Sequence, residues 1–453
     1  MRFRNHSALL LTIISMISAL PQGAYASNTD EIDNLIRQYK HDTKCENVSV
    51  VVYDNTETSC YGDSEDLYQI GSMTKAFTGL AVQMLIGEGL VDEDGVISDY
   101  IPGYEAYYDS EKVDITVRNL LEQKSGYTNS EKDYPSATDT MTLSDWAADI
   151  SGRELCSRPG TEYAYSNVNY NLLGLIIENV SGMPYREYME KELLIPLGLD
   201  DTHVGMPSDG RIAQGSRIGF RHAFDYPMTV REASVPAGYF YSSVVDMGRW
   251  IEIWTGNTDV PEGLKEPLAK VKGYLNKDGD YYCGWELFED GVIGHSGGTP
   301  NYSSRIVFDE KRKIGVCVLA NLNVAATTDS LCNSIYDVVS GKDPSGLNVD
   351  IWTIFDKIFT GVTIAGILLF VMSLMVRNRT VLTVLDVVLA VLLMSVLILF
   401  PIIFGAGLKE ILLTWAPWSV TGGLVAIGGV VTAATIRIST VKKYADHNKA
   451  GKR

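Results

Sequence analysis

Three long apolar runs close this chain, and they restrict its fold more than any other feature. Residues 358–376, 381–404 and 411–436 each have the length and apolar character of a helix that crosses a bilayer. A helix buried in a globular core is rarely apolar all round over such a length. The sequence therefore predicts a membrane domain at residues 346–453, with transmembrane helices at about 355–376, 381–404 and 411–436.

The basic residues near these runs predict their orientation. Arg377 and Arg379 follow the first run, and a basic tail that begins at Arg437 follows the third. Cytoplasmic flanks are enriched in Lys and Arg, so the tail is expected in the cytoplasm and the body of the chain outside the membrane. Trp415 and Trp418 would then lie at the outer interface. Asp386, inside the second run, is expected at an interface or paired with another helix.

The N-terminus agrees with this topology. Arg2 and Arg4 precede an apolar stretch at residues 8–20, and a small-residue cleavage pattern ends at Ala26. Residues 1–26 are interpreted as a signal peptide that is removed, with a retained anchor as the alternative. The predicted location is the cell membrane, with a multi-pass chain, an extracytoplasmic body and a cytoplasmic C-terminus.

The body is strongly acidic and carries all the cysteines. Residues 27–351 hold 26 basic and 52 acidic side chains, a net charge of −26. This charge argues against nucleic acid as a partner. The six cysteines lie where disulfides can persist, but their pairing does not follow from the sequence. The absence of C-x-x-C and H-E-x-x-H patterns gives no support for a metal, and no cofactor is expected.

Apolar periodicity predicts one α+β domain at residues 27–345. Residues 31–39 have a helical pattern, residues 48–53 alternate as a strand, and a second strand is expected near Cys60. Residues 91–269 have mostly helical patterns. Strands are predicted again at 281–288, 291–295, 303–308 and 314–320, before a helix at 327–339. Strands at both ends with helices between them indicate a sheet assembled from both termini, with residues 340–346 as a linker to the membrane domain.

A serine with a lysine one helical turn later is the main catalytic candidate. Ser72 and Lys75 stand in the segment Gly71–Lys75, where the following apolar residues recur at helical spacing. A serine hydroxyl is a poor nucleophile until a neighbouring group takes its proton, and Lys75 can be that group. Because early helix N–H groups have no partner within the helix, the Ser72 N–H is free to donate to an oxyanion.

Two further motifs follow in order along the chain. Tyr165 and Asn167 form a Y-x-N triplet, and His295 with Gly297 bounds an H-S-G triplet at the end of a predicted strand. Lys75 and Tyr165 both have reference pKa values near ~10, so each needs its surroundings to become a base. One of the two takes the Ser72 proton, and Tyr165 could return it to the leaving amine; the sequence leaves this assignment open.

Similar motifs elsewhere in the chain lie in the wrong context. The S-x-x-K at Ser439 falls in the basic tail. Lys124-Ser125-Gly126 resembles the H-S-G triplet, but it ends a helical stretch, whereas that motif is expected on a strand. A Ser-His-Asp enzyme with a G-x-S-x-G elbow is disfavoured, since Ile70 replaces the first glycine.

These residues resemble the class C-like β-lactamases and penicillin-binding proteins. Over nearly the whole chain the sequence is most similar to membrane-anchored prodrug-activating peptidases of that superfamily, such as the colibactin-maturation peptidase. The resemblance rests on residues 71–80, on Pro300–Ser304, on Leu319–Asn321 and on Thr414–Pro417. It implies an antiparallel sheet flanked by helices, an all-helical region and three membrane helices.

The resemblance also implies the residue roles. Ser72 would be acylated, with Lys75 and Tyr165 as bases, and the N–H groups of Ser72 and Gly298 would form the oxyanion hole. The expected substrate-binding residues are Asn167, His295, Ser296, Gly297 and Asn301.

The implied reaction is removal of an N-acyl-D-amino acid, with D-asparagine as the candidate, from a secreted natural product. Asn301 stands where one contact to that asparagine is expected. Asn167 replaces the serine of the colibactin enzyme, so strict D-asparagine selectivity is not implied. His295 is mostly neutral at pH 7 and holds a carboxylate less well than a lysine, which favours an internal amide over a terminal D-alanine. Expected partners are a small peptide or acylated natural product, the lipid bilayer and, as an open alternative, a second copy of the chain.

Two other functions remain open from the sequence. One is a cell-wall DD-peptidase or weak β-lactamase, and the other is a non-catalytic membrane-bound sensor. The intact set of Ser72, Lys75 and Tyr165 argues against the sensor.

Overall fold

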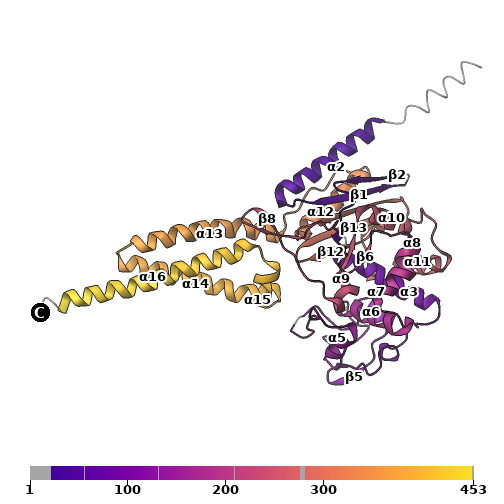
Figure 1. Ribbon diagram of the computed structural model, residues 1–453, viewed down its shortest axis with the longest axis horizontal. Coiled ribbons are helices and arrows are strands. Elements are labelled where there is room, and N and C mark those ends of the chain that lie inside the picture. Colours follow the sequence, from indigo (N-terminus) through magenta and orange to yellow (C-terminus); the bar gives the residue numbers. More distant parts are fainter. Residues whose placement is uncertain (1–21, 56, 131, 209, 276–280, 451–453) are drawn as a thin grey trace, which may run out of the picture.

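The structure is a computed structural model that describes residues 22–55, 57–130, 132–208, 210–275 and 281–450 (Figure 1). Most of the predicted signal peptide, residues 1–21, lies outside these ranges. Residues 22–26 begin helix α2 (Gln22–Thr43), which contains the helix predicted at residues 31–39.

The body is built on a seven-stranded antiparallel sheet. In the order in which they hydrogen-bond, its strands are β10 (Tyr281–Tyr282), β11 (Trp285–Leu287), β12 (Ile293–Thr299), β13 (Tyr302–Asp309), β14 (Ile314–Ala320), β1 (Val48–Asp54) and β2 (Glu57–Tyr61). Strand β1 pairs with β14 from Val48 opposite Ala320 to Asp54 opposite Ile314, so the two ends of the domain meet within the sheet, one strand from its β2 edge. The α+β prediction is confirmed.

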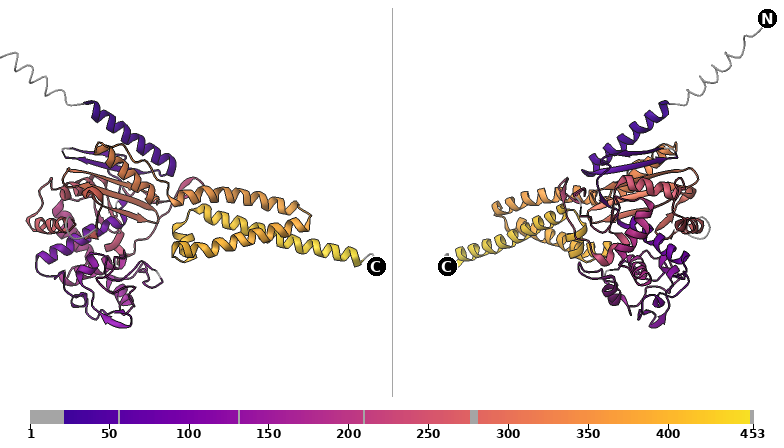
Figure 2. Two further views of the ribbon diagram at one scale, coloured as in Figure 1. Left: turned by 180° about the vertical axis from the view of Figure 1, so that it is seen from behind. Right: turned by 45° about the vertical axis from the view of Figure 1, so that its right-hand side comes forward.

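Both faces of the sheet are covered by helices (Figure 2). Val50 and Val52 of β1 belong to the hydrophobic core under α2 and α12 (Ala325–Val339), which lie on one face. Val51 and Tyr53 belong to the larger core on the opposite face, where α10 (Val244–Thr255) packs against β1. Because successive strand residues point to opposite faces, burial of both faces produces the continuous apolar run at residues 50–53.

A helical region covers that second face. Its helices are α3 (Thr74–Gly87), α4 (Val117–Leu121), α5 (Leu143–Ile150), α6 (Asn167–Ser181), α7 (Tyr185–Tyr188), α8 (Ile195–Leu197), α9 (Val235–Gly238) and α11 (Glu262–Leu275). Short strands that the helical pattern did not predict interrupt it: β3 (Tyr68–Gln69), β4 (Ala106–Tyr108), β5 (Glu111–Val113), β6 (His203–Val204), β7 (Ser216–Gly219), β8 (His222–Asp225) and β9 (Phe240–Ser242). Strands this short carry too few residues for a period-2 pattern to be visible.

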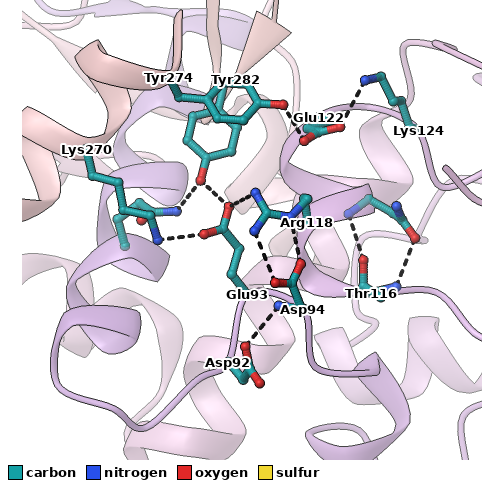
Figure 3. Close-up of polar contacts among 12 residues, drawn as sticks. Asp92, Glu93, Asp94, Thr116, Arg118, Glu122, Lys124, Lys270, Tyr274 and Tyr282 are labelled. Atoms are coloured by element: carbon teal, nitrogen blue, oxygen red, sulfur yellow. Dashed lines mark hydrogen bonds and ion pairs between the residues drawn. The ribbon is translucent and has the colours of Figure 1, made fainter. Parts of the chain in front are cut away.

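A buried carboxylate ties the helical region to the edge of the sheet (Figure 3). Glu93 accepts hydrogen bonds from Arg118 of α4 at 3.0 Å and from the Tyr282 hydroxyl of β10, and it pairs with Lys270 of α11 at 2.6 Å. Its side chain is 7% exposed, so these partners offset the cost of removing the charge from water. The network joins three elements that are far apart in the sequence.

Three long apolar helices extend side by side from the body (Figure 1). They are α13 (Ile351–Met375), α14 (Arg379–Phe404) and α16 (Trp418–Ala450), and each is long and apolar enough to cross a membrane. Inside the second helix, Asp386 accepts a hydrogen bond from Thr435 of α16 at 3.0 Å. The expected pairing of this carboxylate with another helix is confirmed.

The third apolar run differs from the prediction at its start. The long helix begins at Trp418 and not at residue 411, because Pro417 lacks an N–H and Ala416 adopts an extended conformation before it. Residues 408–415 form a separate element, in which α15 (Leu408–Glu410) continues into the π-helix η6 (Ile411–Trp415). This segment lies against the body near the base of the long helices (Figure 1).

Candidate active site

Ser72 lies in a tight turn that presses against strand β12. The chain leaves β3 through Ile70 and forms the 3₁₀ turn η1 (Gly71–Met73) before helix α3. Gly71 has a φ of +53°, and a Cβ there would lie 2.6 Å from the N atom of Gly298. A Cβ on Gly297 would lie 2.1 Å from the Ile70 carbonyl oxygen. Glycine at these two positions therefore allows the serine turn and the strand to approach each other.

Lys75 is fully buried beneath Ser72. Its Nζ lies 3.0 Å from Ser72 Oγ, 2.8 Å from Asn167 Oδ1 and 2.6 Å from the Ala237 carbonyl oxygen. A neutral amine has two N–H donors and one lone pair. The two carbonyl oxygens accept the two donors, so the lone pair is directed to the only hydroxyl among these three partners. The three contacts therefore suit a neutral Lys75 that accepts the Ser72 proton.

Burial acts on the two candidate bases in a way that distinguishes them. Burial lowers the pKa of Lys75 well below its usual value, which favours the neutral amine. Burial raises the pKa of Tyr165, against the opposing effect of its hydrogen bond with Ser72, which favours the neutral phenol. Lys75 Nζ lies 4.9 Å from the centre of the Tyr165 ring. The free site is therefore suited to Lys75 as the base and to Tyr165 as a hydroxyl that passes a proton on.

The start of helix α6 supplies Asn167. Ser166 caps this helix by accepting a hydrogen bond from the N–H of Val168. The N–H of Asn167 donates to Asn129 Oδ1 at 2.8 Å, and its side-chain oxygen faces Lys75. Asn167 thus connects the lysine to the loop that contains Asn129.

Gly298 is placed to share an oxyanion with Ser72. Strand β11 pairs with β12 only up to Gly294, so the rest of β12 extends beyond β11 toward the serine turn. Gly298 is exposed, and no atom lies within 4 Å of the position of a Cβ there. The cavity wall includes both Ser72 and Gly298, which are the two residues expected to donate their N–H groups.

The other expected substrate-binding residues are not among those that line the cavity. His295 is 3% exposed, and its Nδ1 lies 2.6 Å from the Ser296 carbonyl oxygen. Burial lowers the pKa of His295 to about 3, so the ring is neutral at pH 7. Gly297 is buried, and the Ser296 hydroxyl accepts from Arg305 at 2.7 Å. Asn301 is also buried, and it donates to the Tyr226 carbonyl oxygen at 2.8 Å.

A cavity of about 430 Å³ opens in front of Ser72. Tyr165, Asn167 and Gly298 line it together with Thr128, Asn129, Tyr134, Asn171, Arg231, Tyr239, Pro300, Glu410, Thr414 and Trp415. The last three residues belong to α15 and η6, between the second and third long helices. The segment that joins these two helices is therefore part of the wall of this cavity.

The sequence reasoning did not assign these three wall residues. It placed residues 411–436 in the bilayer, which hid the break at Pro417. Two residues in the sequence could have predicted this break. Glu410 is charged and Pro417 cannot continue a helix, so the segment between them is too short to be part of a transmembrane helix. Within the described residues, no three His, Cys, Asp or Glu side chains are grouped to hold a metal ion.

Comparison with known proteins agrees with this geometry. The model of the family described as Beta-lactamase matches residues 32–335, which include every element of the site except the α15–η6 segment. The chain belongs to the beta-lactamase family. The body therefore has the class C beta-lactamase-like fold and is a serine hydrolase of this family.

The sequence is also similar to those of curated bacterial proteins. "Protein flp" of Staphylococcus aureus (strain COL) is 33% identical over 266 residues, which are 56% of this chain and 53% of that protein. A "Putative D-alanyl-D-alanine carboxypeptidase" of Escherichia coli (strain K12) is 35% identical over 147 residues, which are 30% of this chain and 33% of that protein. The aligned part of the chain thus spans about half the length of the first relative and a third of the second.

Solved structures of the family share the fold at low identity. The octameric penicillin-binding protein homologue from Pyrococcus abyssi has a TM-score of 0.60 at 22% identity, over 73% of this chain and 81% of its own. The "Beta-Lactamase/D-Alanine Carboxypeptidase" from Pseudomonas syringae has a TM-score of 0.59 at 18% identity, over 70% of this chain and 99% of its own.

Proposed function

We propose that this chain is a membrane-anchored, extracytoplasmic serine peptidase that cleaves the amide after an N-acyl-D-amino acid. The candidate residue is D-asparagine, and the product would be a matured natural product that the cell exports. The observation that carries the proposal is the character of the site. Uncharged amide side chains line the cavity with Ser72, and the first residue of the H-S-G motif is the neutral His295 and not a cation.

The proposed reaction passes through an acyl-enzyme. Ser72 Oγ attacks the carbonyl carbon while its proton moves to the neutral amine of Lys75, and the N–H groups of Ser72 and Gly298 hold the oxyanion. The C–N bond breaks as the Tyr165 hydroxyl gives its proton to the leaving amine, and Lys75 restores that proton. Water then hydrolyses the Ser72 ester with the same groups, which regenerates the serine and releases the acyl-D-amino acid.

The proposed selectivity for the substrate side chain depends on three asparagine side chains in the cavity. Asn129, Asn167 and Asn171 line the cavity, and a primary amide can both donate to and accept from a substrate carboxamide. Asn301 donates to the Tyr226 carbonyl oxygen and is not among the residues that line the cavity, so the asparagine contact expected there is assigned instead to these three residues. A site built to hydrogen-bond a polar side chain rejects analogues that leave its groups unpaired.

The neutral His295 supports cleavage of an internal amide. In enzymes with a lysine at this position, the cation can hold the terminal carboxylate of a peptide. Here the ring is buried and uncharged, with its Nε2 3.5 Å from the Tyr281 hydroxyl. A free carboxylate next to the scissile bond would therefore lack that partner.

A DD-peptidase is the second candidate, and Arg231 is the observation that favours it. This guanidinium lines the same cavity and could pair with a substrate carboxylate. Its Nε lies 3.8 Å from Asp139, which offsets part of the charge. A weak β-lactamase belongs with this second candidate, whereas a non-catalytic sensor would not need the neutral Lys75.

The test is intact-mass spectrometry of the full chain in detergent micelles with three substrates. These are an N-acyl-D-asparaginyl amide, its L-asparaginyl isomer and a D-alanyl-D-alanine peptide, with Ser72→Ala as the control. The expected result is a mass increase on Ser72 and product from the D-asparaginyl amide alone. Preferential turnover of the D-alanyl-D-alanine peptide would replace the proposal with the DD-peptidase, and no Ser72-dependent turnover of any substrate would contradict both.

A further inference from the structure

The β7–β8 hairpin contacts the ends of the long helices that lie next to the body. Its turn residues Phe220 and Arg221 have φ values of +51° and +66°. The Arg221 N–H donates to Asp356 of α13 at 2.9 Å, and a Cβ on Gly422 of α16 would lie 2.6 Å from the Phe220 ring. The tip of the hairpin is therefore inserted between the first and third long helices.

Arg217, at the base of the same hairpin, contacts the segment in front of the cleft. Its guanidinium donates to the Leu412 carbonyl oxygen at 2.6 Å and to that of Leu413 at 2.8 Å. It also donates twice to the Ala416 carbonyl oxygen, from Nε at 2.6 Å and from Nη2. Its carbon Cζ lies 4.2 Å from the centre of the Trp418 ring, and the residue is 2% exposed.

These three carbonyl oxygens lie where η6 ends and have no following turn to bond them. The last carbonyls of a helix lack intrahelical donors and carry the negative end of its dipole. The planar guanidinium has five donors and makes four hydrogen bonds to these three oxygens, whereas a lysine ammonium has three donors that spread from one atom. The contact is specific for arginine.

The segment that Arg217 holds also forms the outer wall of the cavity. Glu410, Thr414 and Trp415 line the cavity from this side, and the Trp415 indole donates to Glu410 at 3.3 Å. Residues 414 and 415 stand between the carbonyls of Leu413 and Ala416, which Arg217 holds. Hydrogen bonds that hold these carbonyls in place therefore also hold Thr414 and Trp415 in the wall of the cavity.

A second contact joins the same segment to the oxyanion strand. The Tyr226 hydroxyl donates to the Leu413 carbonyl oxygen at 2.5 Å, and the Tyr226 carbonyl oxygen accepts from Asn301. Asn301 follows Gly298 by three residues in the turn between β12 and β13. The hairpin therefore touches both the wall of the cavity and the strand that carries the oxyanion donor.

We propose that Arg217 is a positioning residue that holds the α15–η6 segment over Ser72 and so completes the substrate cavity. Its effect is on substrates that fill the cavity and not on the reactivity of Ser72 itself. The proposal needs only the serine hydrolase chemistry of the family, and it applies whichever acyl substrate the enzyme prefers.

The test compares Arg217→Met and Arg217→Lys with the wild type, as full chains in detergent micelles. For the amide substrate that the wild type turns over, Arg217→Met is expected to lower kcat/KM at least tenfold, mainly through KM. Acylation of Ser72 by p-nitrophenyl acetate, which occupies only the reacting centre, should change less than twofold. Arg217→Lys should show the same pattern with a smaller loss. Hydrogen exchange measures the position of the segment directly, and amides of residues 408–416 should exchange at least tenfold faster in Arg217→Met.

Arg221→Lys is the matched control, because that side chain faces α13 and not the wall of the cavity. It should leave kcat/KM and the exchange of residues 408–416 within twofold of the wild type. Equal losses with the amide and the acetate would make Arg217 a merely structural residue and would overturn the proposal. Unchanged exchange of residues 408–416 in Arg217→Met would overturn it as well, even if no amide substrate were found. Failure of the D-asparaginyl amide as a wild-type substrate would count against the proposed function alone.

Discussion

Lys75 Nζ lies 3.0 Å from Ser72 Oγ, inside a site where the other two partners of the amine are carbonyl oxygens. An ammonium would also satisfy these oxygens, but full burial of Lys75 disfavours the charge. The amine is therefore held in the form that can accept a proton. This relationship favours Lys75 over Tyr165 as the group that accepts the Ser72 proton.

Replacing Lys75 tests that assignment. Lys75→Met keeps most of the side-chain volume but removes the base, and the rate of Ser72 acylation is expected to fall by roughly 10²–10⁴. Lys75→Arg retains a cation that does not lose its proton, and it should be as inactive as Lys75→Met. Stopped-flow acylation by a chromogenic acyl donor measures both rates. An active Lys75→Arg would transfer the role of base to Tyr165.

The pH dependence of kcat/KM follows from the lowered pKa of Lys75. The base must be neutral, so activity is present above the pKa of Lys75 in the folded protein and is lost as the pH falls through it. Because burial lowers that pKa, full activity is expected well below pH ~10.4, the reference value for lysine. A pH–rate profile with p-nitrophenyl acetate measures the midpoint. An acid limb near pH ~10 would mean that Lys75 is charged in the free enzyme.

Adding one methyl group at Gly297 should separate the serine turn from strand β12. A Cβ there would lie 2.1 Å from the Ile70 carbonyl oxygen and 2.2 Å from Ser304 Oγ, so the strand must move. Gly297→Ala is expected to lower kcat at least tenfold, since even a small displacement of the oxyanion donor is costly. Gly273→Ala, in α11, meets no atom within 4 Å and serves as the control for the added methyl group. A fully active Gly297→Ala would show that this approach is not required.

His295 should make the stability of the protein depend on pH. Its pKa is about 3 in the folded protein and ~6.5 in an unfolded chain, so the unfolded state binds more protons between these values. Folding free energy is then lost as the pH falls from about 6.5 toward 3, at up to ~1.4 kcal/mol per pH unit. Thermal unfolding of the wild type and His295→Gln between pH 4 and 7 measures the difference in slope. Parallel slopes would mean that His295 is protonated in the fold.

The reactivity of the cysteines tests which of them are buried in the fold. All six are free thiols, of which Cys60 and Cys156 are exposed and the other four are buried. Burial raises the pKa of the Cys45 thiol to about 12, which further slows its alkylation. Brief treatment of the native protein with a maleimide should therefore add two labels by mass spectrometry, and denaturation should expose six. Fewer than six labels after denaturation without reductant would indicate a disulfide.

The strands and the candidate catalytic motifs could be predicted because each depends on residues that are close together in the sequence. Strand β1 and helix α3 follow from alternation and from helical spacing, and the distance of one turn between Ser72 and Lys75 follows from helix geometry. The α+β arrangement followed from the positions of the strands at the two ends of the body. The short hairpin β7–β8 gave no such signal, because four residues per strand are too few to show a period.

The roles of His295 and Asn301 illustrate a second limit. The sequence places both beside Gly298, and proximity along the chain suggested contact with substrate. In the structure, His295 lies on the same face of β12 as Gly297, but Tyr165 and Tyr281 pack against its ring and it is not among the residues that line the cavity. How far a side chain on that face is covered depends on aromatic rings from distant parts of the chain, and no local motif records that.

By itself, the sequence determined the candidate nucleophile, the candidate bases and the presence of three long apolar helices, since each depends on residues within a few positions of one another. Only the tertiary structure decided that the segment before the third helix forms a wall of the catalytic cavity. The contact responsible joins Arg217 to Ala416 across 199 positions in the chain. Such a contact exists only when the hairpin and the C-terminal helices pack together, because a guanidinium and three helix-end carbonyls become partners through folding and not through sequence spacing.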